Sequence, residues 1–330
     1  MAVPAPLRGR RILDLGAFCA QRPHALAASM CARLCAGYGA EVVRPLPPGG
    51  EPFARDEPRL PDGGSALDRF LNAGKRIGPA AGAFDAAIGD RAALADHATL
   101  APIRVRLSVF GPDEPDPPMT ELGLAALAGL LGIVGEPMPA PPSRLAGHQV
   151  AYSAGLAACT ALLAALRAGG EEVVDVSLLD VTAWLNWKVA AGVIVTGRAP
   201  TREAERVTWF TLPARDGHMA LVYQDKDWPN FRAVIGDPRL EADPRFATHA
   251  LRTANRAALL EVIGPWFAAR TRVEITAAMQ ARRVPLGPVN WPAELLEDAQ
   301  YRARDVLGRD GMPALPVAWD GQRLGHADAA

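Results

Sequence analysis

The sequence lacks most of the short motifs that mark common enzyme families. Its 330 residues contain no G-x-x-x-x-G-K-[ST] loop, no G-x-G-x-x-G run, no H-E-x-x-H pair and no G-x-S-x-G elbow. The turn after the first apolar run carries a single glycine, Gly16, so the dinucleotide-binding fingerprint is absent. The sequence therefore does not favour a nicotinamide-dependent dehydrogenase.

Cysteine is scarce, with four residues in the whole chain. Cys31 and Cys35 are spaced to share one face of a helix, but neither belongs to a C-x-x-C pair. The nearest further residue of a metal-ligating type is His24, which is too little for a zinc site. We expect buried, apolar thiols in a reducing compartment, and no metal site.

Neither sign of charge is in excess. Lysine and arginine total 35 and aspartate and glutamate 36, so the net charge of −1 creates no global field that favours nucleic acid or an anionic membrane. The chain begins without a basic-then-apolar leader, and the apolar stretches at 122–134 and 154–166 are too short to cross a bilayer. These features predict a cytoplasmic protein with no nucleic-acid or membrane partner.

The apolar pattern that is present predicts an α/β fold. A short buried strand at 11–15, a helix at 23–37 and a second strand at 40–43 form a βαβ unit, which requires a parallel sheet. Further strands are expected at 84–88, 103–110 and 173–177, and helices at 120–131, 153–168 and 178–194.

Composition divides the chain into unequal parts. A polar, basic stretch at 197–205 ends the first α/β pattern, and 330 residues exceed what one core usually supports. We expect a large domain over 1–198, a linker and small domain over 199–305, and a return segment or tail over 306–330. In the small domain we expect a strand at 216–222 and helices at 228–235, 254–269 and 273–282.

Three groups of residues are candidates for binding or catalysis. Lys75 and Arg76 follow a glycine and suit a phosphate group, although a solvated basic turn is the simpler interpretation. His148 precedes an expected helix, where a histidine either exchanges protons or lies in an ordinary surface loop. Trp184 and Trp187 are three residues apart on one helix face, as expected in a core or an interface.

Seven segments resemble, in order, the family III CoA-transferases of the CaiB/BaiF or formyl-CoA-transferase type. The two most specific are Val174-Asp-Val-Ser-Leu-Leu-Asp180 and Asp243-Pro-Arg-Phe-Ala-Thr248. The others lie at 7–15, 39–52, 72–76, 109–111 and 284–290. Their shared order over nearly the whole chain carries the resemblance.

The resemblance implies an open, parallel, Rossmann-like sheet, a second, smaller α/β domain, and two chains interlocked as a homodimer. It also implies that an acyl-CoA thioester binds as substrate at the carboxyl edge of the sheet, without a separate cofactor. By position, Lys75 and Arg76 would meet the phosphates of CoA, and Cys19 and Ala20 would line the thioester region.

The nucleophile of this family is missing from the sequence. In the family an aspartate at the start of a helix attacks the thioester, and alignment on Gly155 puts Ala151 at its position. A methyl group cannot carry this chemistry. Glu121 and His148 are the candidate substitutes within this chain, and a carboxylate from a partner chain is a third possibility.

Two functions therefore stay open. The first is an enzyme that transfers CoA between an acyl-CoA and a carboxylic acid, which the resemblance favours. The second is a catalytically degenerate homologue that binds acyl-CoA or regulates an active relative, which the loss of the aspartate favours. The sequence names neither the acyl group nor the acceptor.

Overall fold

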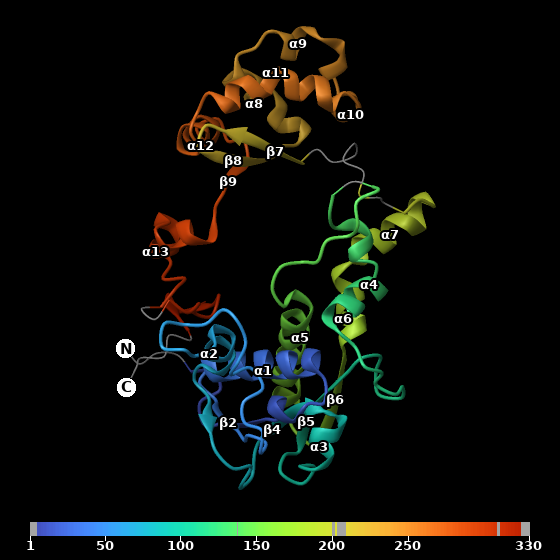
Figure 1. Ribbon diagram of the computed structural model, residues 1–330, viewed down its shortest axis with the longest axis vertical. Coiled ribbons are helices and arrows are strands. Elements are labelled where there is room, and N and C mark those ends of the chain that lie inside the picture. The colour runs from blue at the N-terminus through green and yellow to red at the C-terminus, as the bar shows by residue number, and fades with distance from the viewer. Residues whose placement is uncertain (1–4, 137, 200–201, 203–208, 309–310, 325–330) are drawn as a thin grey trace. The chain divides into compact units, whose positions relative to one another are not determined.

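The computed structural model describes residues 5–136, 138–199, 202, 209–308 and 311–324, and the chain divides into two compact units (Figure 1). The first unit comprises Met1–Arg202 and Ala299–Ala330, and the second comprises Glu203–Asp298. Both units combine helices and strands, as the apolar pattern predicts.

A six-stranded, fully parallel sheet forms the centre of the first unit, in the order β3-β2-β1-β4-β5-β6. The strands are β1 (Arg11–Asp14), β2 (Glu41–Arg44), β3 (Arg76–Ile77), β4 (Ala86–Asp90), β5 (Ile103–Ser108) and β6 (Glu172–Ser177). The order reverses between β1 and β4. In open α/β sheets, ligands bind outside the carboxyl ends of the strands at such a reversal.

Helices cover both faces of this sheet, because successive side chains along each strand point to opposite faces. Ile12 on β1 packs into the same core cluster as α1 and α5, whereas its neighbour Leu13 packs into the cluster of α3. The helical elements of this part are η1 (Gly16–Phe18), α1 (Arg22–Gly37), α2 (Ala66–Asn72), α3 (Arg91–Ala95), α4 (Glu121–Leu127), η2 (Leu131–Ile133) and α5 (Gln149–Ala168).

Helices α1 and α5 approach each other closely. A Cβ added at Gly155 of α5 would lie 2.7 Å from the Cβ of Met30 and 2.8 Å from the carbonyl oxygen of Ala27, so this position requires glycine. The small residues of α5 therefore serve helix packing in the core. The expected stop at Gly169 is confirmed, with φ at 77°.

The start of α5 differs from the prediction. The helix begins at Gln149, four residues before the point expected from Ser153, and His148 is its N-cap. His148 makes no side-chain cap bond, but a distant carboxylate described below accepts the N–H of Ala151 and replaces the usual local cap. A local pattern cannot reveal a cap supplied by another helix.

By length and composition α5 is long and apolar enough to cross a membrane, with a mean hydropathy of 1.5 over 18 residues. The expectation that its apolar stretch is too short was wrong in this respect, because the helix starts earlier than predicted. In the structure 44% of this window is buried, and most of the buried residues of α5 belong to the core that also contains α1 and the sheet. A core helix passes the same test.

The expected helix at 178–194 is two helices, α6 (Leu178–Leu185) and α7 (Trp187–Thr196), which meet at a bend of 61°. The break falls at Asn186, whose side-chain amide donates to the carbonyl of Ala128. Trp184 and Trp187 are 73% and 61% exposed, so neither lies in the core of this chain. The interface interpretation stays a prediction.

The chain re-enters the first unit after residue 298. This return comprises α13 (Ala299–Ala303) and a hairpin of β10 (Ala318–Trp319) and β11 (Gln322–Arg323). Leu315 and Leu324 are buried in the same core cluster as α1. Their burial fixes the returning segment to the first unit.

The second unit is built on a three-stranded antiparallel sheet, β7-β8-β9. Its strands are β7 (Trp209–Ala214), β8 (Gly217–Val222) and β9 (Leu286–Val289), of which only β8 was predicted. Its helical elements are η4 (Asp225–Asp227), α8 (Trp228–Ile235), α9 (Arg239–Ala242), η5 (Pro244–Phe246), α10 (His249–Ala254), α11 (Arg256–Ala268), α12 (Arg272–Gln280) and η6 (Pro292–Leu296). Phe231, Phe246 and Phe267 are fully buried in its core.

Candidate functional site

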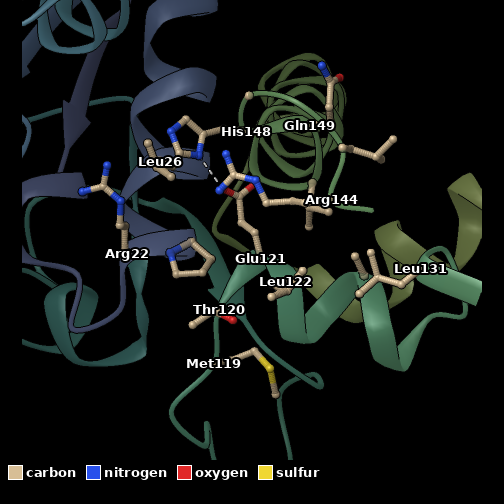
Figure 2. A pocket seen from close by; sticks show the side chains of 15 residues that line it. Arg22, Leu26, Met119, Thr120, Glu121, Leu122, Leu131, Arg144, His148 and Gln149 are labelled. Atoms are coloured by element: carbon tan, nitrogen blue, oxygen red, sulfur yellow. Dashed lines mark hydrogen bonds and ion pairs between the residues drawn. The ribbon is translucent and has the colours of Figure 1, made fainter. Parts of the chain in front are cut away.

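A pocket of about 220 Å³ lies at the N-terminus of α5 (Figure 2). It is bounded by the first turns of α1, by α4, and by the segment that leads into α5. Apolar side chains form much of its wall, and its polar lining comes from Arg22, Thr120, Glu121, Arg144, His148 and Gln149.

Glu121 and His148 meet in this pocket, although 27 residues separate them in the sequence. The Nδ1 atom of His148 lies 2.5 Å from Oε2 of Glu121, and the other carboxylate oxygen, Oε1, accepts the N–H of Ala151 at 2.9 Å. With Glu121 ionised, Nδ1 carries the proton and donates it to the carboxylate. The two candidate substitutes named from the sequence thus contact each other, and Glu121 also contacts the backbone of Ala151.

Local structure explains how Glu121 reaches α5. Thr120 is the N-cap of α4, and its hydroxyl accepts the N–H of Gly123 at 3.1 Å. This cap fixes the first turn of α4 and points Glu121 across to α5 (Figure 2). The ring of His148 packs edge-on against Tyr152 one turn later, with centroids 5.9 Å apart, which restricts its orientation.

Ala151 itself is fully buried. Its methyl group belongs to a small apolar cluster with Ala25, Leu26, Phe53 and Leu71. Phe53 follows the glycine turn after β2, and Leu71 lies in α2, so these two elements pack against the start of α5. The side chain at position 151 therefore lies between the pocket and the loops at the carboxyl end of β2.

The pocket brings charged groups of both signs to the N-terminus of α5. The N-terminus of the 20-residue helix α5 carries a partial positive charge. Arg22 lies in the wall and pairs with Asp56 at 2.8 Å. Arg144 is exposed in the wall and makes no hydrogen bond or ion pair within the described part of the chain. One carboxylate, Glu121, and two guanidinium groups thus line the same space.

A second polar centre is buried at the carboxyl end of β1. Asp14 is fully buried, and its Oδ2 lies 2.7 Å from Nη1 of Arg44 and 2.8 Å from Nζ of Lys75. Burial alone would raise the pKa of Asp14, but these two cations hold it well below its usual range. Arg44 also binds both carboxylate oxygens of Glu51, at 2.7 and 2.8 Å, which fixes the loop after β2.

Comparison with known proteins identifies the family. A model of CoA-transferase family III matches residues 101–324. This chain belongs to CoA-transferase family III. It is 27% identical to the succinyl-CoA–D-citramalate CoA-transferase of Chloroflexus aurantiacus, over 92% of this chain and 83% of that protein.

Two further family members support the assignment. The succinate–glutarate CoA-transferase of Agrobacterium fabrum is 28% identical over 56% of this chain and 49% of its own length. The crystal structure of a CaiB/BaiF family protein from Brucella suis superposes with a TM-score of 0.81, covering 97% of this chain and 94% of that chain at 22% identity. The resemblance stated from the sequence motifs is thereby confirmed, and the structural match establishes a shared fold.

The four residues assigned to CoA by position in the family lie in different settings. The ammonium of Lys75 is buried and donates to Asp14, to the carbonyl of Ser29 at 2.9 Å and to Oδ1 of Asn72 at 3.2 Å, which uses its three protons. Arg76 is exposed, and its guanidinium pairs with Glu41 at 2.9 Å. CoA binding by either residue stays a prediction, and only Arg76 offers its cation to solvent.

Cys19 and Ala20 follow β1 at the reversal of strand order. Ala20 is exposed, and its N–H donates to Oδ2 of Asp90 at 2.7 Å, which ties this turn to the end of β4. Burial raises the pKa of the half-buried Cys19 thiol, and the nearby Asp90 raises it further. Their place at the thioester also stays a prediction.

Sequence reasoning missed several charged residues. Asp14 had a signal, because it is a charged residue between the apolar residues Leu13 and Leu15 of the first strand pattern. Arg22 and Arg144 had none, since an arginine in a turn is ordinary and only the fold brings these two to one pocket.

Proposed function

We propose that this protein transfers CoA from an acyl-CoA to a carboxylic acid, and that Glu121 supplies the carboxylate that position 151 lacks. The observation that carries the proposal is the 2.9 Å hydrogen bond between Oε1 of Glu121 and the N–H of Ala151. It supports the proposal because it holds a carboxylate beside position 151, which the family resemblance aligns with the nucleophilic aspartate. No resident cofactor is needed, because CoA enters and leaves as part of the substrates.

The chemistry balances with one carboxylate. A Glu121 oxygen attacks the thioester carbonyl, the C–S bond breaks, and a mixed anhydride and CoA thiolate form. The thiolate then attacks the glutamyl carbonyl, which releases the donor acid and leaves a glutamyl-CoA thioester. The acceptor acid attacks this thioester, and the displaced CoA thiolate takes the acyl group of the second anhydride, which restores Glu121.

Neighbouring groups suit these steps. The Nδ1–H group of His148 donates to Oε2 of Glu121, so Oε1 is the oxygen that attacks. For the attack, Oε1 gives up its hydrogen bond with the N–H of Ala151 and bonds to the thioester carbon. That N–H then faces the site, and with the α5 dipole it can stabilise the oxyanion that develops.

The substrate that suits the pocket is a small dicarboxylic acid. Arg144 and Arg22 provide positive charge for a second carboxylate, and a space of about 220 Å³ fits a short carbon chain. The two curated relatives described above are named for succinate, citramalate and glutarate, which belong to this class.

A degenerate acyl-CoA-binding homologue is the second candidate. The observation that favours it is that both oxygens of Glu121 already have partners, one on α5 and one on His148. In that case Glu121 is a helix cap and the pocket only binds a ligand.

Mass spectrometry of the intact protein separates the two candidates. After incubation with succinyl-CoA, the proposed enzyme acquires the mass of CoA through a hydroxylamine-sensitive bond, and peptide mapping places that bond at Glu121. A protein that acquires no adduct and shows no turnover with a panel of acyl-CoAs and dicarboxylic acids is the degenerate homologue.

We also propose that two copies interlock as a homodimer, as the family resemblance implies. Exposed apolar side chains on α6 and α7, which a second copy would bury, are Trp184, Trp187, Ile194 and Val195. Light scattering should give twice the mass of the chain at micromolar concentration, and a stable monomer would contradict this.

A further inference from the structure

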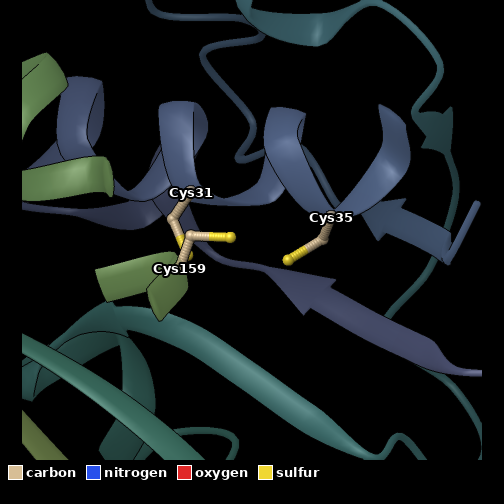
Figure 3. Close-up of side chains that lie close together, drawn as sticks. All are labelled: Cys31, Cys35 and Cys159. Carbon is tan, nitrogen blue, oxygen red and sulfur yellow. The ribbon is translucent and has the colours of Figure 1, made fainter. Parts of the chain in front are cut away.

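Three cysteine side chains meet between α1 and α5 (Figure 3). Cys31 and Cys35 come from α1 and Cys159 comes from α5, and their three Sγ atoms all lie within 4.8 Å of one another. All three residues are free thiols with 0–2% exposure. The fourth cysteine, Cys19, is half-buried and lies outside this group.

The packing of the two helices creates this arrangement. Cys31 and Cys35 are one turn apart on α1 and face α5, where Cys159 lies one turn after the close contact at Gly155. The sequence-based expectation of no metal site weighed only ligands near Cys31 and Cys35 along the chain. Cys159 is 124 residues beyond Cys35, so only the fold adds the third sulfur.

The surroundings limit what these sulfurs can bind. Their neighbours in the core cluster are apolar, and among the described residues no fourth histidine, cysteine or carboxylate joins the group. Structural zinc sites are almost always tetrahedral with four protein ligands, which this group does not provide. Soft thiolate ligands also select Cu(I). A monovalent ion with three sulfur ligands and no water matches the donor set.

We propose that Cys31, Cys35 and Cys159 form a binding site for one Cu(I) ion. With metal–sulfur bonds of about 2.3 Å, a planar three-sulfur site needs sulfurs about 4.0 Å apart. The present separations, all within 4.8 Å, are closed by side-chain shifts of less than about 1 Å.

Binding of Cu(I) to the three thiols involves no change of oxidation state. Each Cu–S bond replaces an S–H bond, so up to three protons pass to solvent and the site gains up to two negative charges. A site that keeps one thiol protonated gains one charge less.

The test uses the full-length protein, without oxygen, and Cu(I) delivered as its acetonitrile complex. Competition with a coloured Cu(I) chelator should give one bound ion per chain. X-ray absorption should show three sulfur neighbours at about 2.3 Å. Bound copper should also raise the melting temperature, because the folded protein brings three thiols to one ion and binds it more tightly than the unfolded chain does.

The matched variants are Cys159→Ala and Cys19→Ser. Cys159→Ala should weaken Cu(I) binding at least about 100-fold, whereas Cys19→Ser should leave it unchanged. Cys35→Ser serves as a second variant where Cys159→Ala fails to fold, as judged by circular dichroism. The proposal is wrong if the wild type binds Cu(I) no more tightly than Cys159→Ala or Cys35→Ser does. It is also wrong if the X-ray absorption spectrum lacks three sulfur neighbours.

Discussion

The carboxylate of Glu121 accepts the backbone N–H of Ala151, with 2.9 Å between Oε1 and the nitrogen. Glu121 therefore caps the N-terminus of α5, as a local side chain does in most helices, although it lies in the first turn of α4. The contact has a further consequence. Residue 151 has only a methyl side chain, but the carboxylate of Glu121 lies within hydrogen-bond distance of its backbone nitrogen.

Glu121→Gln separates the chemical role of this residue from its structural role. The glutamine carbonyl can still accept the N–H of Ala151, so we expect the melting temperature to change little. Since an amide cannot form the anhydride, transfer should fall by about 10³-fold or more and the CoA adduct should disappear. Initial rates with succinyl-CoA and intact-protein mass spectrometry measure both effects.

The control for this variant is Glu121→Ala, which removes the cap as well. It should be equally inactive and also less stable, by about 0.5–2 kcal/mol, because an N–H at the start of α5 loses its partner. A fully active Glu121→Gln protein would show that the nucleophile is elsewhere.

Ala151→Asp tests whether position 151 and Glu121 serve the same site. In the wild-type background the new carboxylate lies beside Glu121, so the two like charges should lower stability and raise the pKa of one of them. In the Glu121→Gln background this repulsion is absent, and a CoA adduct should return on the carboxylate introduced at position 151, with partial transfer activity. An inactive double variant that folds normally would mean that the two positions do not face the same thioester.

Arg76 and Lys75 should behave differently when each is replaced by alanine. Arg76→Ala should fold normally and weaken CoA binding by about 1.5–3 kcal/mol, because an exposed cation that meets a phosphate is lost. Lys75→Ala should instead lower stability by about 3–5 kcal/mol, because it breaks a buried ion pair with Asp14. Calorimetry with CoA and urea unfolding measure the two effects.

Arg10→Ala is the matched control for Arg76→Ala. Arg10 is also exposed and pairs with a carboxylate, Asp85, but the family resemblance does not assign it to CoA. Its loss should not change CoA affinity. Equal affinity for CoA in the Arg76→Ala and Arg10→Ala variants would remove Arg76 from the site.

The regular parts of the fold were predictable because local patterns determine them. Apolar runs marked β1, β2, β4, β5, β6 and most of the large helices to within a few residues. Some of the features that were missed depend on distant partners. β7 and β9 gain their hydrogen bonds only by pairing with β8, and the early start of α5 depends on Glu121 from another helix.

The candidate site shows the same division. Glu121 and His148 could be named from the sequence because both flank expected helices and both carry titratable groups. Their contact with each other could not be foreseen, since it depends on how α4 packs beside α5. Lys75 is the opposite case, because its sequence context suggested an exposed phosphate ligand whereas the fold buries its ammonium against Asp14.

Asp14→Asn should reveal how much the buried network contributes to stability. Replacement leaves Arg44 and Lys75 without their shared anion, so we expect a loss of about 3–5 kcal/mol in the free energy of unfolding at pH 7. Asp62→Asn is the control. It breaks the exposed pair with Arg69 and should change stability little, since solvent screens that pair. Urea unfolding at pH 7 measures both losses.

The stability difference between wild type and Asp14→Asn should also depend on pH. The folded pKa of Asp14 lies well below its usual value of 3.8, because the attraction of Lys75 and Arg44 outweighs the opposing effect of burial. As the pH falls below about 4, Asp14 therefore binds a proton in the unfolded wild type but stays ionised in the folded protein. The contribution of Asp14 to the free energy of unfolding then declines. Urea unfolding of both proteins should accordingly show a difference that is constant from about pH 5 to 7 and narrows below about pH 4. A difference that widens on acidification would mean that Asp14 is protonated in the folded protein and that Arg44 and Lys75 are held by other groups.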